Sequence, residues 1–284
     1  MNPLFSCLLD LLRKFDSLSV PLTIGGGFGL YLKRCFLERT GERILFSELP
    51  DIRSTNDLDV FLRADVLADF ARTRDVAGAI SGLGYRPVET AKYLQWERPI
   101  KIGVIPQVVK IDFLVGPLGR YRPYLKVKPP RARPKKLIAF HAHMVEEALH
   151  LEDQPMGLPI EGSTSDGDTY CGTVYVPEAF PYLMMKLHAF HDRRTDQEKD
   201  LGRHHALDVY TIVGMMLEEE FERAKKLGRA DRDEQRVAKA RLIVSQDFSS
   251  LTAPGILRIR EHALFRDSLM LDDLVSVLAE IFAV

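Results

Sequence analysis

Apolar and polar residues alternate at helical spacing over residues 3–17, where one apolar stripe contains Leu4, Phe5, Leu8, Leu12 and Phe15. This pattern predicts an amphipathic helix. An apolar run at 20–24 then leads into Gly25-Gly26-Gly27-Phe28-Gly29, and residues 30–37 return to helical spacing. When a strand is followed by a glycine turn and the start of a helix, backbone N–H groups can face a phosphate. Glycine clusters also occur in ordinary turns.

Residues 53–62 read Arg-Ser-Thr-Asn-Asp-Leu-Asp-Val-Phe-Leu and predict a strand. Side chains on a strand alternate, so Asp57 and Asp59 leave one face while Leu58 and Val60 enter the core. Two carboxylates roughly 6.6 Å apart repel each other unless a cation offsets the charge. Oxygen-only ligands suit Mg²⁺ or Mn²⁺.

Another run rich in β-branched residues, at 108–115, contains a single carboxylate, Asp112, on the same side as Lys110. An unpaired buried aspartate costs several kcal/mol, so a lysine, a set of hydrogen bonds or a metal should compensate it. If this strand lies beside the first, Asp112 joins Asp57 and Asp59, and the three carboxylates can hold two metal ions.

The remaining pattern predicts helices at 64–83, 180–192 and 196–216, followed by further amphipathic helices up to 282. In the helix at 196–216, Lys199 and Arg203 would stack at four-residue spacing. We therefore expect an α+β fold, in which a mixed sheet flanked by helices over residues 1–176 precedes a mostly helical domain over 177–284.

Composition narrows the class of protein. The 284 residues carry a net charge of −1, which excludes a uniformly basic nucleic-acid binder, and the three cysteines suit a reducing compartment. No apolar run approaches the roughly 18 residues that a membrane helix needs. These features predict a cytoplasmic protein that does not enter a membrane.

One segment departs from this neutral balance, because residues 120–136 contain no acidic side chain. Tyr121 and Tyr124 interleave with its cations, which are Arg120, Arg122, Lys126, Lys128, Arg131, Arg133, Lys135 and Lys136. Such a strip could follow an RNA backbone while the tyrosines stack on bases. The alternative is a solvated, extended, proline-rich loop.

Two alternatives concern the acidic residues. Ser165-Asp166-Gly167-Asp168 is a second Asp-x-Asp, which we interpret as a turn and which is the main competitor for the metal site. Arg53 could neutralise a phosphate or pair with a neighbouring aspartate, and the second is the default.

Taken together, the glycine pair opening a helix, the Asp-x-Asp strand and the later aspartate resemble the polymerase β type nucleotidyltransferase superfamily. More narrowly, Gly26-Gly27-Phe28-Gly29-Leu30 and Arg53-x-Thr55-x-Asp57-Leu58-Asp59 look like the AbiEii/AbiGii toxin family and the related mycobacterial nucleotidyltransferase toxins. The second signature of that family is matched by Lys186-Leu187-His188-Ala189, Arg193, Lys199-Asp200 and Asp208. Gly27 stands where many superfamily members have serine, which leaves phosphate contacts to backbone amides.

The resemblance implies a nucleotidyltransferase fold with Asp57, Asp59 and Asp112 as ligands of Mg²⁺ or Mn²⁺. It also implies that Lys186 is catalytic. The residues implied to bind the nucleotide are Gly26, Gly27, Arg53, Thr55, Arg193, Lys199 and Asp200, with Asp200 and Asp208 orienting the cations.

The implied function is transfer of a nucleoside monophosphate from an NTP to an acceptor hydroxyl. The acceptor could be a tRNA 3′ end or a protein hydroxyl. The implied role of the protein is that of a toxin with a cognate antitoxin. Two alternatives are a small-molecule nucleotidyltransferase of the antibiotic-modifying sort and a catalytically silent domain that binds RNA or a partner.

Overall fold

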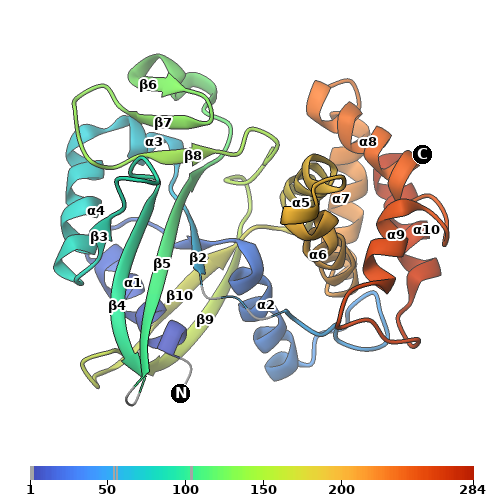
Figure 1. The fold of residues 1–284 in the computed structure, drawn as a ribbon, viewed down its shortest axis with the longest axis horizontal. Helices are drawn as coiled ribbons and strands as arrows, with labels where there is room; N and C mark the ends of the chain where they lie inside the picture. Colours follow the sequence, from blue (N-terminus) through green and yellow to red (C-terminus); the bar gives the residue numbers. More distant parts are fainter. Residues whose placement is uncertain (1–2, 54, 56, 103–104) are drawn as a thin grey trace. The chain divides into compact units, whose positions relative to one another are not determined.

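The computed structural model describes residues 3–53, 55, 57–102 and 105–284 (Figure 1). They divide into two compact units. Unit 1 comprises Met1–Gly29, Thr55–Glu146 and Leu151–Pro177, and unit 2 comprises Leu30–Ser54, Glu147–His150 and Glu178–Val284. This division differs from the expected domains 1–176 and 177–284, because residues 30–54 and 147–150 pack with the helical unit.

A ten-stranded mixed sheet forms the centre of unit 1 in the described part of the chain. Its strands are β1 (Thr23–Ile24), β2 (Asp57–Phe61), β3 (Arg86–Pro87), β4 (Gln95–Ile102), β5 (Ile105–Val115), β6 (Leu125–Lys128), β7 (Arg131–Pro134), β8 (Ala142–Met144), β9 (Met156–Ser163) and β10 (Thr169–Val176). The order is β6-β7-β8-β5-β2-β1-β10-β9, with β4 between β3 and β5. Since β5 runs parallel to β2 and antiparallel to β4, the predicted α+β class with a mixed sheet is confirmed.

The two faces of the central strands differ in chemistry. Leu58 lies opposite Ile111, and Val60 opposite Phe113, and all four side chains are fully buried. Because side chains alternate along a strand, the three aspartates of β2 and β5 lie on the other face. We call this second face, defined by Asp57, Asp59 and Asp112, the carboxylate face.

The apolar face is covered by the amphipathic helix α1 (Pro3–Ser17), which packs on β9 and β10 and contacts α4 (Figure 1). A Cβ atom on Gly172 of β10 would come within 3.0 Å of Leu12, so the absence of a side chain there lets the helix approach the sheet closely. The helix at 3–17 is therefore present as predicted.

The predicted helix at 64–83 is two helices, α3 (Ala64–Ala68) and α4 (Phe70–Gly82). Asp69 is extended between them, and its carboxylate accepts hydrogen bonds from the N–H groups of Ala71 and Arg72. An aspartate whose side chain caps a new helix start ends the preceding helix.

Unit 2 is helical, as expected for the C-terminal part of the chain. The helix α2 (Gly26–Thr40) begins in unit 1 and continues into unit 2. The other helices are α5 (Ala179–Arg193), α6 (Arg203–Gly214), α7 (Glu218–Ala230), α8 (Gln235–Asp247), α9 (Pro254–Arg260) and α10 (Leu271–Phe282). The helix α5 is buried along most of its length against α6, α7 and α8.

The expected helix at 196–216 is wrong in its first part. A short 3₁₀ segment, η2 (Gln197–Gly202), precedes α6, and Asp200, Leu201 and Gly202 have positive φ angles of 53°, 51° and 74°. This left-handed stretch breaks the helical register, so Lys199 and Arg203 do not stack at one-turn spacing. Among the described residues, no helix is long and apolar enough to cross a membrane.

Candidate active site

The carboxylate face is built by the register of two parallel strands. Asp59 of β2 lies directly opposite Asp112 of β5, and Asp57 lies opposite Lys110. Neighbouring strands are about 4.8 Å apart and residues two apart on a strand about 6.6 Å, so the three carboxylates originate from one small patch. The structure thus brings together the three aspartates that the sequence places in separate segments.

The electrostatics of Asp112 reflect this crowding. Burial raises the pKa of Asp112, and the nearby Asp57 carboxylate raises it further, whereas Lys110 lowers it. The Gln95 side chain donates a 2.9 Å hydrogen bond to Asp112 Oδ1 and also lowers the pKa. Gln95 lies opposite Asp112 in the register of β4 with β5. The sequence does not single out Gln95, because its only signal is a polar position at the start of a strand.

The glycine turn lies against Asp59. The N–H of Gly25 donates to the Asp59 carbonyl at 2.7 Å, and Gly26, which begins α2, has a φ of +58°. A Cβ atom added to Gly26 would lie 1.7 Å from Asp59 Oδ2. Glycine at position 26 is therefore required both by the backbone conformation and by contact with the carboxylate. The positive end of the helix dipole also lies beside this negative charge.

The donor chemistry of the carboxylate face fits a hard divalent cation, since all three side chains offer carboxylate oxygens. Within the described residues, however, no group of three or more His, Cys, Asp or Glu side chains is already arranged to hold a metal ion. The hydrogen bond from Gln95 holds one oxygen of Asp112. A metal ion would therefore have to draw the carboxylates together.

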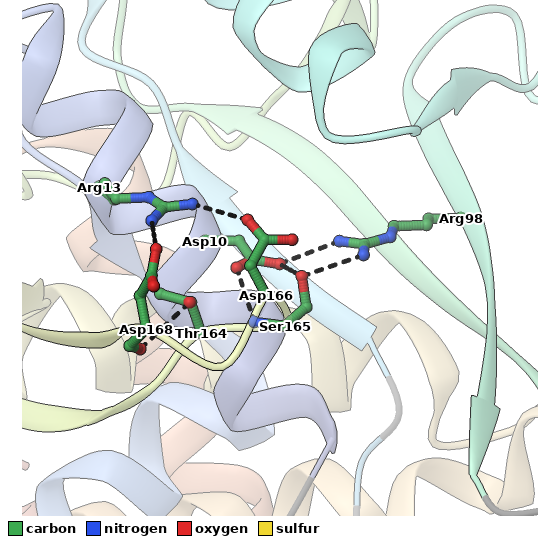
Figure 2. Close-up of polar contacts among 7 residues, drawn as sticks. All are labelled: Asp10, Arg13, Arg98, Thr164, Ser165, Asp166 and Asp168. Atoms are coloured by element: carbon green, nitrogen blue, oxygen red, sulfur yellow. Dashed lines mark hydrogen bonds and ion pairs between the residues drawn. The ribbon is translucent and has the colours of Figure 1, made fainter.

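The second Asp-x-Asp belongs to a different arrangement (Figure 2). Arg13 of α1 binds Asp166 at 3.0 Å and Asp168 at 3.1 Å, so one guanidinium lies between the two carboxylates. Nearby, the buried Asp10 carboxylate accepts hydrogen bonds from the N–H and hydroxyl of Ser165, and pairs with Arg98 at 3.0 Å. These contacts fix the turn between β9 and β10 onto α1, which is a structural role.

In unit 2, Lys186 and Arg53 share one carboxylate. Lys186 Nζ lies 2.6 Å from Asp208 Oδ2, and Arg53 Nε lies 3.0 Å from Asp208 Oδ1. The contact of Lys186 with Asp208 joins α5 to α6, and the two cations hold the pKa of the buried Asp208 below its usual range against the effect of burial. Arg53 thus has the aspartate partner expected by default.

His205 lies in the same cationic surroundings. Its pKa is lowered to about 3, mainly by burial and also by Lys186, Arg193 and Arg53, whereas Asp208 acts in the opposite direction. His205 is therefore neutral at physiological pH. The sequence signals this histidine only by its position three residues before Asp208.

Two further residues implied by the resemblance lie near this cluster: Arg193 lowers the pKa of His205, and Asp200 acts with Asp208 on the pKa of His262. Arg193 donates from Nη1 to the Ala189 carbonyl at 3.3 Å. Lys199 is exposed in η2, and Asp200 pairs with Arg203 at 3.4 Å and with His204 at 3.8 Å.

The two further residues assigned to nucleotide binding flank the carboxylate strand and the glycine turn. Thr55 Oγ1 lies 3.5 Å from the N–H of Asp57, and Gly27 is the second residue of α2.

The basic strip is not simply an extended loop. It forms a 3₁₀ turn, η1 (Gly119–Tyr124), and the hairpin β6–β7, in which Lys126 lies opposite Arg133 and Lys128 opposite Arg131. Like charges directly opposite each other destabilise a hairpin. Tyr124, at the end of η1, is 64% exposed. The hairpin therefore places four cations on one face. One of them, Arg133, also donates from Nη1 to the carbonyls of Pro134, Lys135 and Lys136.

No protein-family model matches this chain, and a search of curated proteins finds no significant relative.

Proposed function

We propose that the protein is a metal-dependent nucleotidyltransferase of the polymerase β type, related to the AbiEii/AbiGii toxins. One observation carries the proposal: Asp59 and Asp112 are partners in parallel strands, with Asp57 on the same face and the glycine turn in contact with Asp59. Carboxylates gathered beside the N-terminus of a helix suit the binding of a metal–triphosphate complex.

In this proposal, Asp57, Asp59 and Asp112 hold Mg²⁺ or Mn²⁺, which would neutralise phosphate charge and lower the pKa of the acceptor hydroxyl. The acceptor oxygen forms a bond to the α-phosphorus, the bond to the β-phosphate oxygen breaks, and pyrophosphate leaves. Asp112 accepts the proton of the hydroxyl.

The glycine turn contributes backbone N–H groups that bind phosphate oxygens. Gly26 and Gly27 serve here in place of the serine hydroxyl found in many superfamily members. The assignment of Lys186, Arg193, Lys199 and Asp200 to the triphosphate rests on the resemblance alone, as do the roles of Arg53 and Thr55. Asp208 orients Lys186 and Arg53 through the contacts described above.

The hairpin β6–β7 favours a nucleic acid as acceptor, because its opposed cations match the spaced charges of a phosphate backbone. We therefore propose RNA, such as a tRNA 3′ end, ahead of a protein hydroxyl. A toxin role with a cognate antitoxin follows from the resemblance. The small-molecule alternative leaves this hairpin without a role.

The test uses the purified chain with Mg²⁺, total RNA and each of the four NTPs labelled on the α-phosphate, which stays with the product. Label should enter RNA with the wild type and be lost with Asp59→Ala. As a matched control, the double variant Asp166→Asn/Asp168→Asn should retain transfer, because these carboxylates bind Arg13. Full transfer by Asp59→Ala would refute the proposed site, and label in small molecules or nowhere would favour the two alternative functions.

A further inference from the structure

A cavity of about 220 Å³ lies on the same face of the sheet as the carboxylates. Thr23 of β1, Phe61 of β2 and Tyr175 of β10 line it, and these residues are partners across three neighbouring strands, Phe61 opposite Thr23 and Thr23 opposite Tyr175. Since Phe61 is two residues after Asp59, it lies on the same face about 6.6 Å further along the strand. The cavity therefore lies on the same face as the carboxylates, and Phe61 is the lining residue nearest to Asp59 along β2.

Glycine residues set the position of both aromatic rings. A Cβ atom on Gly25 would lie 2.4 Å from the ring of Phe61, so this ring lies directly against the glycine turn. A Cβ atom on Gly157, the β9 partner of Tyr175, would lie 3.5 Å from the Tyr175 ring. Both rings thus rest on backbone, which holds them as fixed walls of the cavity.

Size and lining restrict the ligand. Pockets for whole drug-sized ligands measure roughly 300–1,000 Å³, so about 220 Å³ accommodates a ring system rather than a whole nucleotide. Most of its lining residues are apolar or aromatic, and Thr23, Arg63 and Glu152 are the polar ones. One oxygen of Glu152 accepts a 2.9 Å hydrogen bond from the N–H of Ala64, which fixes this carboxylate at the rim.

We infer that this cavity binds the nucleobase of a nucleotide whose phosphate lies at the glycine turn, with the base against Tyr175 and Phe61. The inference rests on the proposed function, because the phosphate position comes from it. Gly25 and Gly26 join the two subsites: one contacts the ring of Phe61, the other the carboxylate of Asp59. The base belongs either to the NTP or to the terminal residue of the acceptor.

The experiment measures binding without catalysis. Dissociation constants of the four nucleosides, of tripolyphosphate with Mg²⁺ and of each NTP with Mg²⁺ are compared for the wild type, Tyr175→Ala and Tyr175→Phe. Removing an aromatic partner of a base should weaken nucleoside and NTP binding by about 5-fold to 100-fold. Tripolyphosphate binding should not change, and Tyr175→Phe, which keeps the ring, should behave like the wild type.

A second variant guards against misfolding of the sheet. Pro155→Phe places a ring at the cavity rim without altering a strand, and it should block nucleosides to a similar degree. If KM for the NTP rises in these variants, the cavity holds the donor base; if KM for RNA rises instead, it holds the acceptor base. Both results support a base site.

The inference is overturned if nucleosides do not bind, or if they bind equally well to the wild type and to both pocket variants. The proposed function fails in a different way: tripolyphosphate with Mg²⁺ would not bind, and Asp59→Ala would not affect transfer. Tyr175-dependent nucleoside binding in such a protein would leave the cavity assignment standing.

Discussion

Gly26→Ala tests whether the glycine turn and the Asp59 carboxylate form one unit. The substitution has two costs. Alanine at a φ of +58° costs about 1 kcal/mol. Its Cβ would also lie 1.7 Å from Asp59 Oδ2 and 2.8 Å from Asp59 Cγ. Turning the carboxylate in place does not relieve the second contact, so χ1 of Asp59 must change, at a further cost of about 1 kcal/mol.

Gly41→Ala is the matched control, because Gly41 has a φ of +66° and a Cβ atom there meets nothing within 4 Å. Urea denaturation should show a loss of about 1 kcal/mol for Gly41→Ala and about 2 kcal/mol for Gly26→Ala. Displacing a catalytic carboxylate by about 1 Å costs on the order of 100-fold in rate. Nucleotidyl transfer should fall by at least that factor in Gly26→Ala and stay unchanged in Gly41→Ala.

A double-mutant cycle isolates the contact. With Asp59→Ala as the background, adding Gly26→Ala should cost no more than Gly41→Ala does, because the clashing oxygens are gone. Equal destabilisation by Gly26→Ala and Gly41→Ala in the wild type would show that Asp59 does not lie against the glycine turn, and would refute the reasoning.

Three further predictions concern titratable side chains. Asp208→Asn should lower the free energy of unfolding by about 3–5 kcal/mol by leaving two cations without their buried partner; a change below 1 kcal/mol would contradict this. Because the pKa of His205 is 6.5 unfolded and about 3 folded, protons bind the unfolded state preferentially as pH falls through this window. The His205 contribution alone should therefore make stability at pH 5 about 2 kcal/mol lower than at pH 8, and His205→Gln should remove that part of the difference. Gln95→Leu should raise the pKa of Asp112 in the metal-free protein, followed by NMR titration, because it removes a hydrogen bond to the carboxylate; an unchanged pKa would contradict this contact.

The local parts of the site were predictable from the sequence. Alternation along a strand places Asp57 and Asp59 on one face wherever the strand lies in the sheet. Whether Asp112 joins them depends on the order of the strands in the sheet, which the sequence does not establish. The contact of Gly26 with Asp59 and the hydrogen bond of Gln95 depend on register between distant segments, and no local pattern encodes either.

Two features of the structure could not be read from residue spacing. The second Asp-x-Asp binds Arg13, more than 150 residues away, and this ion pair gives it a structural role that spacing alone could not reveal. The break in the expected helix at 196–216 depends on positive φ angles at Asp200 and Leu201. Leucine rarely adopts that conformation, so its sequence position gave no warning of a turn.

The distribution of charge gives the strongest reason to look for ligands at the two proposed sites. The described part of the chain neutralises several buried charges within the fold, as in the contact of Lys33 with Glu220 at 2.6 Å. At the two proposed sites like charges lie side by side instead: Asp57 raises the pKa of Asp112, and Lys126 lies opposite Arg133. Both arrangements reduce stability. A cation would remove the repulsion at the first place and a polyanion at the second, and these are the two charged species that a nucleotidyltransferase acting on RNA must bind.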